Sequence, residues 1–134
     1  MSIENKKILI VDDDNFLIDM YSLKFKNKGA KVETAHGSKE ALDKLENDLD
    51  PDIIILDIIM PGMDGITLLK EMMEKDLIKN AVVIMLTNQS LKEDVDKAKQ
   101  FNVDGYIVKA TKIPSEVVDE VESIYINNNK NNLQ

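Results

Sequence analysis

Hydrophobic residues along this chain occur in short continuous runs, separated by longer segments in which they recur every three or four positions. The runs predict five β-strands, at residues 7–11, 31–35, 52–56, 81–86 and 105–108. Most of them are apolar throughout, as strands covered on both faces of a sheet usually are. Residues 31–35 (KVETA) alternate between polar and apolar instead, which is typical of a strand at the sheet edge.

The segments between the runs predict five amphipathic helices, because apolar side chains three and four positions apart fall on one helix face. Gly29 is placed to end the first helix, and Ser90 with Glu93 forms a capping box on the fourth. Asp64 can cap the third helix, and Asp14 either faces solvent or caps the first. The predicted apolar faces are Phe16, Met20 and Leu23; Ala41, Leu42, Leu45 and Leu49; Ile66, Leu69 and Met73; Leu91, Val95 and Ala98; and Val117, Val121, Ile124 and Tyr125.

The alternation of strands with helices predicts a parallel α/β sheet. Five strands are too few for a closed eight-stranded barrel, so we expect an open, doubly wound, flavodoxin-like sheet with the strand order 2-1-3-4-5. Ligands of such sheets bind beyond the carboxyl ends of the strands where the order reverses, here between the first and third strands. Asp12, Asp13 and Asp14 follow the first strand, and Asp57 follows the third. These carboxylates predict an oxygen-rich pocket for a hard divalent cation such as Mg²⁺.

Thr87 and Lys109 stand at the ends of the fourth and fifth predicted strands, where a hydroxyl and a mobile ammonium face the same pocket. Both groups can bind the oxygens of a phosphoryl group. Carboxylates that hold Mg²⁺ and a further carboxylate as acceptor complete a set that favours phosphoryl transfer, in which positioning and charge stabilisation supply most of the catalysis. The single histidine, His36, follows the edge strand and is interpreted as an ordinary surface residue.

The charge balance excludes some partners. The net charge is -8 and every basic residue is lysine, so direct binding of nucleic acid by this chain is not expected. The longest apolar run, residues 81–86, is far too short to cross a bilayer, so no membrane association is expected. A chain without cysteine, and without a secretory signal in MSIENKK, is expected in the cytoplasm.

The length predicts one domain. With 134 residues, of which 43% are hydrophobic, the chain can bury a sizeable core. We place the domain at residues 1–127. Residues 128–134 belong to an asparagine-rich stretch without an apolar period, and they are predicted to be a disordered tail or the stub of a linker.

Four motifs occur in order at the predicted strand ends: ILIVDDD, IIILDIIMPGMDG (residues 53–65), VIMLT (83–87) and DGYIVKA (104–110). The second is the most specific, because an acidic residue at a strand end is followed by a Met-Pro-Gly turn and then by Asp64 and Gly65 at the entry to the next helix. Together the motifs resemble the receiver domain of two-component response regulators, over about residues 5–127.

The resemblance implies that Asp57 is the phosphoacceptor, a carboxylate nucleophile that takes a phosphoryl group from a phosphohistidine donor. It also implies that Mg²⁺ is the cofactor. Asp12 and Asp13 would hold the ion directly or through water, and Asp57 with the backbone carbonyl of Ile59 would complete the protein ligands.

By the same resemblance, Thr87 and Lys109 bind the phosphoryl oxygens, and Tyr106 is the aromatic residue that rotates on activation. The acyl phosphate then changes the surface formed by the fourth helix, the fifth strand and the fifth helix. The implied partners are a sensor histidine kinase or a histidine phosphotransfer protein, and a downstream protein target. The domain would be a monomer or a weak phosphorylation-dependent dimer, and would catalyse its own phosphorylation and dephosphorylation without turning over a separate substrate.

Two positions depart from the family pattern. Ala110 stands where a proline usually follows Lys109 in a cis peptide. A cis peptide before a residue other than proline costs about 2.5–4 kcal/mol, so a trans peptide is expected here. Asn88 stands where a small residue is common, and its bulk narrows the access to the phosphoryl site.

Two other functions stay open. A receiver-like module that is never phosphorylated would use the same fold for protein binding. A phosphatase of the haloacid dehalogenase type would use the D-x-D spacing of Asp12 and Asp14, but that motif normally continues to Thr or Val where this chain has Phe16, and Asp57 would be idle.

Overall fold

The computed structural model describes residues 2–88 and 92–132 of the chain. Five strands alternate with five α-helices along these residues, and a short 3₁₀-helix, η1, follows the last strand. None of the described helices combines the length and the apolarity that a bilayer span requires. The elements are β1 (Lys7–Val11), α1 (Asn15–Asn27), β2 (Lys31–Ala35), α2 (Ser38–Glu46), β3 (Ile53–Asp57), α3 (Gly65–Glu74), β4 (Val82–Thr87), α4 (Lys92–Gln100), β5 (Gly105–Val108), η1 (Lys109–Thr111) and α5 (Pro114–Asn132).

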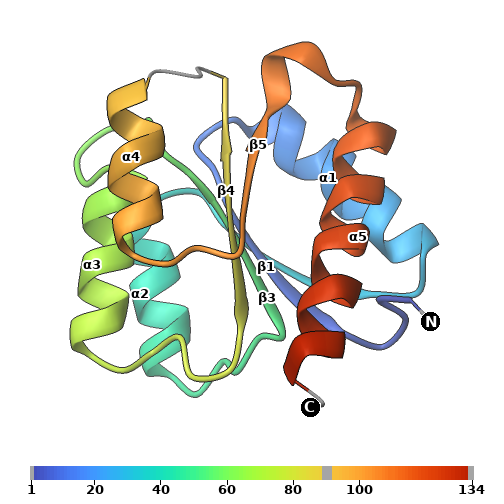
Figure 1. The fold of residues 1–134 in the computed structure, drawn as a ribbon, viewed down its shortest axis with the longest axis horizontal. Coiled ribbons are helices and arrows are strands. Elements are labelled where there is room, and N and C mark those ends of the chain that lie inside the picture. The colour runs from blue at the N-terminus through green and yellow to red at the C-terminus, as the bar shows by residue number, and fades with distance from the viewer. Residues whose placement is uncertain (1, 89–91, 133–134) are drawn as a thin grey trace.

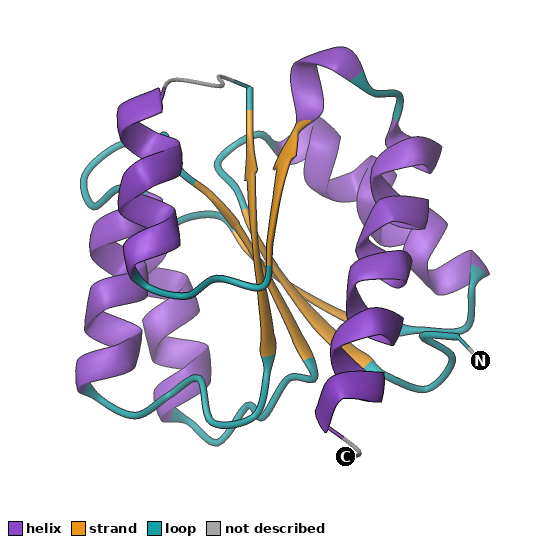
Figure 2. Ribbon diagram, in the orientation of Figure 1, coloured by secondary structure: helices purple, strands orange, loops and turns teal. Residues whose placement is uncertain are grey.

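The strands form one sheet in the order β2-β1-β3-β4-β5, and every neighbouring pair is parallel. Helices α1 and α5 cover one face of this sheet, and α2, α3 and α4 cover the other (Figures 1 and 2). The predicted open, doubly wound α/β fold with order 2-1-3-4-5 is therefore confirmed.

Three strands have the predicted bounds, whereas β3 and β4 each begin and end one residue later than predicted. The difference arises because backbone pairing continues through the first polar residue of each strand end. Asp57 is still in register with Leu86, and Thr87 with Val108. Asp57 and Thr87 are therefore the last residues of buried strands, and their backbones are held by the sheet itself.

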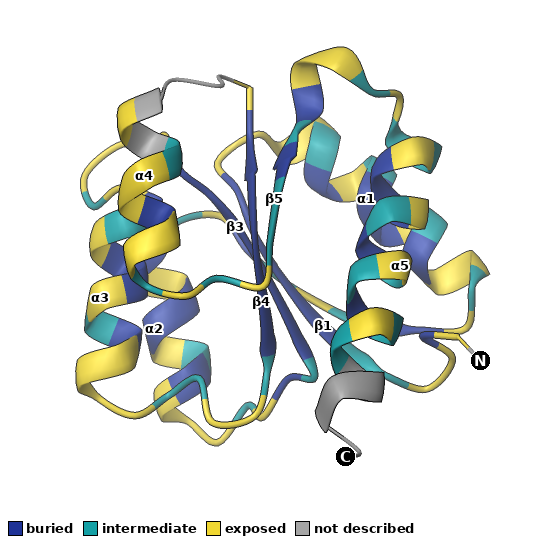
Figure 3. Cartoon of the chain, in the orientation of Figure 1, coloured by how far each residue is buried: buried dark blue, intermediate teal, exposed yellow. Residues whose placement is uncertain are grey.

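The core consists of two hydrophobic clusters, one on each face of the sheet (Figure 3). Alternate residues of the central strands supply them, because successive side chains of a strand point to opposite faces. In β1, Ile8 and Ile10 belong to the cluster under α1 and α5, whereas Leu9 and Val11 belong to the cluster under α2, α3 and α4. The central strands are thus buried on both sides, and only their ends can carry chemistry.

The predicted apolar face of the first helix is wrong. Phe16 and Leu23 are 70% and 58% exposed, whereas the buried residues of α1 are Ile18, Tyr21, Ser22 and Phe25. A helix of period 3.6 accommodates either set, and the set that contains two large aromatic side chains is the one that packs on the sheet. In α3 the predicted Leu69 is buried, but Met72 is buried in place of the predicted Met73, which is 45% exposed.

Several helix ends agree with their predicted chemistry. The carboxylate of Asp14 accepts a hydrogen bond from the backbone N–H of Leu17, and that of Asp64 accepts one from Thr67, so both aspartates are N-caps. Helix α1 ends at Asn27, and Gly29 takes a positive φ of 87° just beyond it. The predicted capping box falls partly on Ser90, which lies outside the described residues, as does Leu91.

Helix α5 continues to Asn132, into the segment predicted to be disordered. Its earlier turns are anchored by Val117, Val121 and Tyr125, which are buried in the core. Once a helix is nucleated, each further residue adds a hydrogen bond at small cost, so the asparagine-rich residues extend it. The boundary of the domain near residue 127 stays a prediction.

Candidate functional site

The sheet register brings the polar strand ends together at one edge. The last residue of β1 is in register with the residue before Asp57 in β3, so Asp12 and Asp57 are neighbours. The same pairing continues through β4 and β5 and brings Thr87 and Lys109 to this edge. The side chains surround a cavity of about 400 Å³. Its lining consists of Asp12, Asp13, Asp14, Asp57, Ile59, Thr87, Asn88 and Lys109.

A buried ion pair lies on one wall of this cavity. The Nζ atom of Lys109 is 2.8 Å from Oδ2 of Asp12 and 3.5 Å from Oδ2 of Asp57. The side chains of Lys109 and Asp12 are 4% and 1% exposed. A buried ammonium is tolerated only beside opposite charge, and here two carboxylates supply it. Lys109 is thus bonded to Asp12 and remains within reach of Asp57.

The carboxyl of Asp57 is crowded by its surroundings. Burial is the largest effect and the negative charge of Asp12 the next, and together they outweigh the opposing charge of Lys109 and raise the pKa of Asp57 to about 7. A hydrogen bond with Asp12 and the charge of Asp13 act in the same direction. The negative field reaches α1, where burial and then the charges of Asp12, Asp14 and Asp57 raise the pKa of Tyr21 to about 12. Sequence reasoning missed Tyr21, since a tyrosine on a helix gives no signal of nearby carboxylates.

Three carboxylates can share one cation. Oxygen atoms of Asp12, Asp13 and Asp57 lie within 4.8 Å of one another. Asp14, the fourth acid of the lining, is engaged elsewhere: its carboxylate caps α1, and its backbone N–H donates to Oδ1 of Asp12 at 2.9 Å. Hard oxygen donors around a surplus of negative charge fit the predicted Mg²⁺.

The loop from β3 to α3 packs tightly under the site. The N–H of Gly65 donates to the carbonyl of Ile58 at 2.7 Å, which closes the base of the loop. A Cβ atom at Gly65 would lie 2.0 Å from the carbonyl oxygen of Asp57, so glycine is required for this close approach. Ile58 and Met60 are buried, whereas Ile59 between them is 52% exposed at the cavity. Gly65, the glycine of the predicted motif, is therefore needed because the helix start passes close to the backbone of Asp57, the candidate phosphoacceptor.

Two other predicted residues lie outside the cavity lining. Tyr106 is on β5, half-buried against the core cluster under α2, α3 and α4. His36 is exposed, and its Nδ1 is hydrogen-bonded to the side-chain oxygen of Asn15, which agrees with a surface role. The peptide between Lys109 and Ala110 is trans as predicted, because the described residues contain no cis peptide bond.

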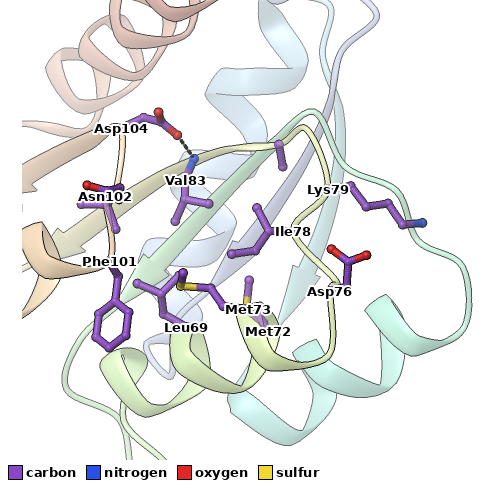
Figure 4. A pocket seen from close by; sticks show the side chains of 12 residues that line it. Leu69, Met72, Met73, Asp76, Ile78, Lys79, Val83, Phe101, Asn102 and Asp104 are labelled. Carbon is purple, nitrogen blue, oxygen red and sulfur yellow. Dashed lines mark hydrogen bonds between the residues drawn. The ribbon is translucent and has the colours of Figure 1, made fainter.

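A second hollow, of about 310 Å³, lies between the end of α3 and the segment that joins α4 to β5 (Figure 4). Its wall combines apolar residues such as Leu69, Met73 and Phe101 with polar ones such as Asp76 and Asp104. The carboxylate of Asp104 in this wall already accepts a hydrogen bond from the backbone N–H of Val83 at 2.8 Å. The clustered carboxylates and the ammonium of the first cavity make that cavity the stronger candidate for phosphoryl chemistry.

Comparison with known proteins gives an independent result. Residues 8–122 match the family model described as the response regulator receiver domain. The chain is 33% identical over 120 residues to the alkaline phosphatase synthesis transcriptional regulatory protein PhoP of Bacillus subtilis, covering 90% of this chain and 48% of that protein. It is 34% identical over 117 residues to the response regulator SaeR of Staphylococcus aureus, with coverages of 87% and 49%. The chain thus spans about half the length of the curated relatives it matches.

Solved structures resemble the whole fold. The chemotaxis protein CheY4 of Vibrio cholerae superposes with a TM-score of 0.79 and is 30% identical, covering 87% of this chain and 96% of that one. A CheY-like receiver domain protein of Methanospirillum hungatei superposes with a TM-score of 0.83 at 28% identity, and covers 96% of this chain and 99% of that one. The likeness extends over nearly the full length of both structures.

Proposed function

Because this chain belongs to the family of response regulator receiver domains, we propose that it is a phosphoryl-receiver switch with Asp57 as the phosphoacceptor. The observation that carries the proposal is the position of Asp57 at a strand end. Its carboxyl shares one cavity with the carboxylates of Asp12 and Asp13, and lies 3.5 Å from the ammonium of Lys109. A carboxylate that can act as the nucleophile, carboxylates that can hold Mg²⁺, and an ammonium that can bind phosphoryl oxygens thus lie in one cavity.

In the proposed reaction, an oxygen of the Asp57 carboxylate attacks the phosphorus of a phosphohistidine. The P–N bond breaks, the imidazole leaves with the bonding electrons and takes up a proton, and an acyl phosphate forms on Asp57. Bound Mg²⁺ would supply charge neutralisation for the phosphoryl oxygens. The residues that would hold it are Asp12, Asp13 and Asp57, with the carbonyl of Ile59. The raised pKa of Asp57 means that the metal-free carboxyl is only partly ionised at neutral pH, so the cation site supports its nucleophilic form.

Lys109 and Thr87 would hold the transferred group. Lys109 lies nearer to Asp12 than to Asp57, so its ammonium can turn from Asp12 to a phosphoryl oxygen without leaving the cavity. Thr87 ends the neighbouring strand and is 1% exposed, which places a hydroxyl on a rigid support in the same lining. Charge-assisted hydrogen bonds from both groups would be formed only after transfer.

We further propose that these bonds change the surface of α4, β5 and α5. Lys109 directly follows β5, and Tyr106 lies on the same strand, half-buried beside the core. A pull on Lys109 would therefore be transmitted along this short strand to the side chain of Tyr106. The downstream protein target would recognise this changed surface.

The phosphoryl donor would approach over the same edge of the sheet. Phe16, Ile59 and Ile113 are 70%, 52% and 61% exposed, and each follows the carboxyl end of a strand. Exposed apolar side chains around a polar cavity are typical of a protein-binding surface. We propose that a sensor histidine kinase or a histidine phosphotransfer protein docks there and presents its phosphohistidine to Asp57.

The test is chemical trapping. The protein is incubated with Mg²⁺ and acetyl phosphate, the acyl phosphate is reduced with borohydride, and the modified residue is mapped by mass spectrometry. Label on Asp57, absent from Asp57→Asn and retained in the exposed-site control Asp19→Asn, is the expected result. Label on Asp12 or turnover of added phosphoesters would indicate the phosphatase, and a chain without label would be a binding module.

A further inference from the structure

Ser38, the first residue of α2, ties that helix to the loop that follows Asp57. Its Oγ donates a hydrogen bond to the carbonyl oxygen of Met63, 2.7 Å away. Ser38 is 5% exposed and Met63 is half-buried, so the bond is partly buried. The two residues are 25 positions apart, and the bond joins the first residue of α2 to the loop between β3 and α3.

The loop that receives this bond is buried at its base and exposed at its tip. Its first limb is anchored because Ile58 and Met60 are buried, and its base is closed by the bond from Gly65 to Ile58. The turn at residues 61–62 is exposed. Met63 follows this turn, so the bond from Ser38 fixes the second limb where the loop returns from solvent.

Helix α2 is a rigid support for the bond. Ala41, Leu42 and Leu45 are buried in the same hydrophobic cluster as Ile58 and Met60. The helix lies beside α3 on one face of the sheet (Figure 1). A hydroxyl on such a support restrains the loop more strongly than a side chain on a second mobile loop would.

We propose that Ser38 is a positioning residue for the phosphoryl-transfer site: through Met63 it holds the loop that carries Ile59, and thereby the Mg²⁺ site. This inference rests on the proposed function, because it concerns the ion that assists phosphorylation of Asp57. Ile59 lines the cavity from the first limb of this loop. A loop that is free at Met63 samples more conformations, so its carbonyl groups are in place for the cation less often.

The experiment compares three variants with the wild type. Ser38→Ala removes the hydroxyl, and Ser38→Thr retains it. Ser22→Ala is the matched control, because Ser22 is also buried in a helix but its Oγ has no hydrogen-bond partner among the described residues. Two quantities are measured for each protein: the Mg²⁺ concentration that gives half-maximal labelling of Asp57 by acetyl phosphate, and the amide hydrogen exchange of residues 59–63 without Mg²⁺.

Ser38→Ala is expected to need about fivefold more Mg²⁺ for half-maximal labelling, the equivalent of one hydrogen bond of about 1 kcal/mol, with near-normal labelling at saturation. Its exchange should become faster at residues 59–63, while Ser38→Thr and Ser22→Ala should match the wild type. An unchanged Mg²⁺ requirement or unchanged exchange in Ser38→Ala would overturn the inference, even if the variant melted at a lower temperature. A wild type that is never labelled would instead contradict the proposed function, and the exchange measurement would still decide whether Ser38 holds the loop.

Discussion

Replacing Asp57, the proposed phosphoacceptor, should make the metal-free protein more stable, although its side chain is buried in the candidate site. Burial and the charge of Asp12 raise the pKa of Asp57 from 3.8 to about 7, so the folded state disfavours its ionised form. Asp57→Asn removes that charge. Lys109 keeps its 2.8 Å bond to Asp12, so the substitution leaves no buried ammonium without a partner.

The sign and size of this stability difference follow from the linkage between proton binding and folding. Below pH 3.8 the carboxyl is protonated in both states, and its charge costs nothing. Between pH 3.8 and about 7 the unfolded chain loses the proton that the folded protein keeps, so wild-type stability falls as pH rises. Above pH 7 the cost is fully present, and at about 1.4 kcal/mol for each pKa unit it approaches an upper limit of about 4 kcal/mol.

The assay is urea unfolding of wild type and Asp57→Asn at pH 5 and pH 8, with a chelator to remove Mg²⁺. The stability advantage of Asp57→Asn should grow by about 2–3 kcal/mol between the two pH values. Asp19→Asn, a replacement of an exposed aspartate on α1, should show no such growth. An advantage that is the same at both pH values, or a variant that is less stable than the wild type at pH 8, would refute the crowding of Asp57.

Three further outcomes are expected. Mg²⁺ at one hundred times its Kd should stabilise the protein by about 2.7 kcal/mol and raise its melting temperature, and the rise should be smaller in Asp13→Asn. An equal rise in both proteins would show that Asp13 is not part of the metal site. Ile59→Asn should speed autodephosphorylation about tenfold, which corresponds to a barrier lowered by about 1.4 kcal/mol. The reason is that asparagine can orient an attacking water, whereas the isoleucine, exposed at the cavity, covers the phosphoryl group. Phosphate release that is unchanged or slower would show that residue 59 does not gate the access of water. Gly65→Ala should lower the free energy of unfolding in urea by about 1–3 kcal/mol, because its Cβ meets the carbonyl oxygen of Asp57; Gly37→Ala, with open space around its Cβ, should change it far less, and comparable losses would contradict this account.

The fold could be predicted from the sequence because its central strands are buried on both faces. Such strands are continuous apolar runs, and their alternation with helices leaves few possible sheets. The predicted ends of β3 and β4 were one residue short because the apolar runs stop before Asp57 and Thr87, whereas both residues are buried and their backbones still pair in the sheet. Asp57 and Thr87 are therefore strand residues, although the prediction placed each just after its strand.

Helix α1 was the least predictable helix, since it carries two apolar faces. Phe16 and Leu23 have the spacing of a buried face, yet they are exposed, and Ile18 and Phe25 pack on the sheet instead. Spacing alone cannot distinguish a face that is buried in the fold from one that is kept for a partner. Only the structure therefore shows which face of α1 packs on the sheet, and the exposed Phe16 is part of the docking surface proposed above.

In the candidate site, residues positioned by strand ends could be predicted from the sequence, whereas contacts made by the loops could not. Asp12 and Lys109 could be predicted because each directly follows a strand, and the order of the strands brings their ends together. The bond from Ser38 to Met63 could not be predicted, because it depends on how the start of α2 approaches the β3–α3 loop across 25 positions, and no periodicity records that approach. Strand ends determine which groups are present at the site. The loops determine how firmly those groups are held, so variants in the loops should alter cation affinity and reaction rate while leaving the fold intact.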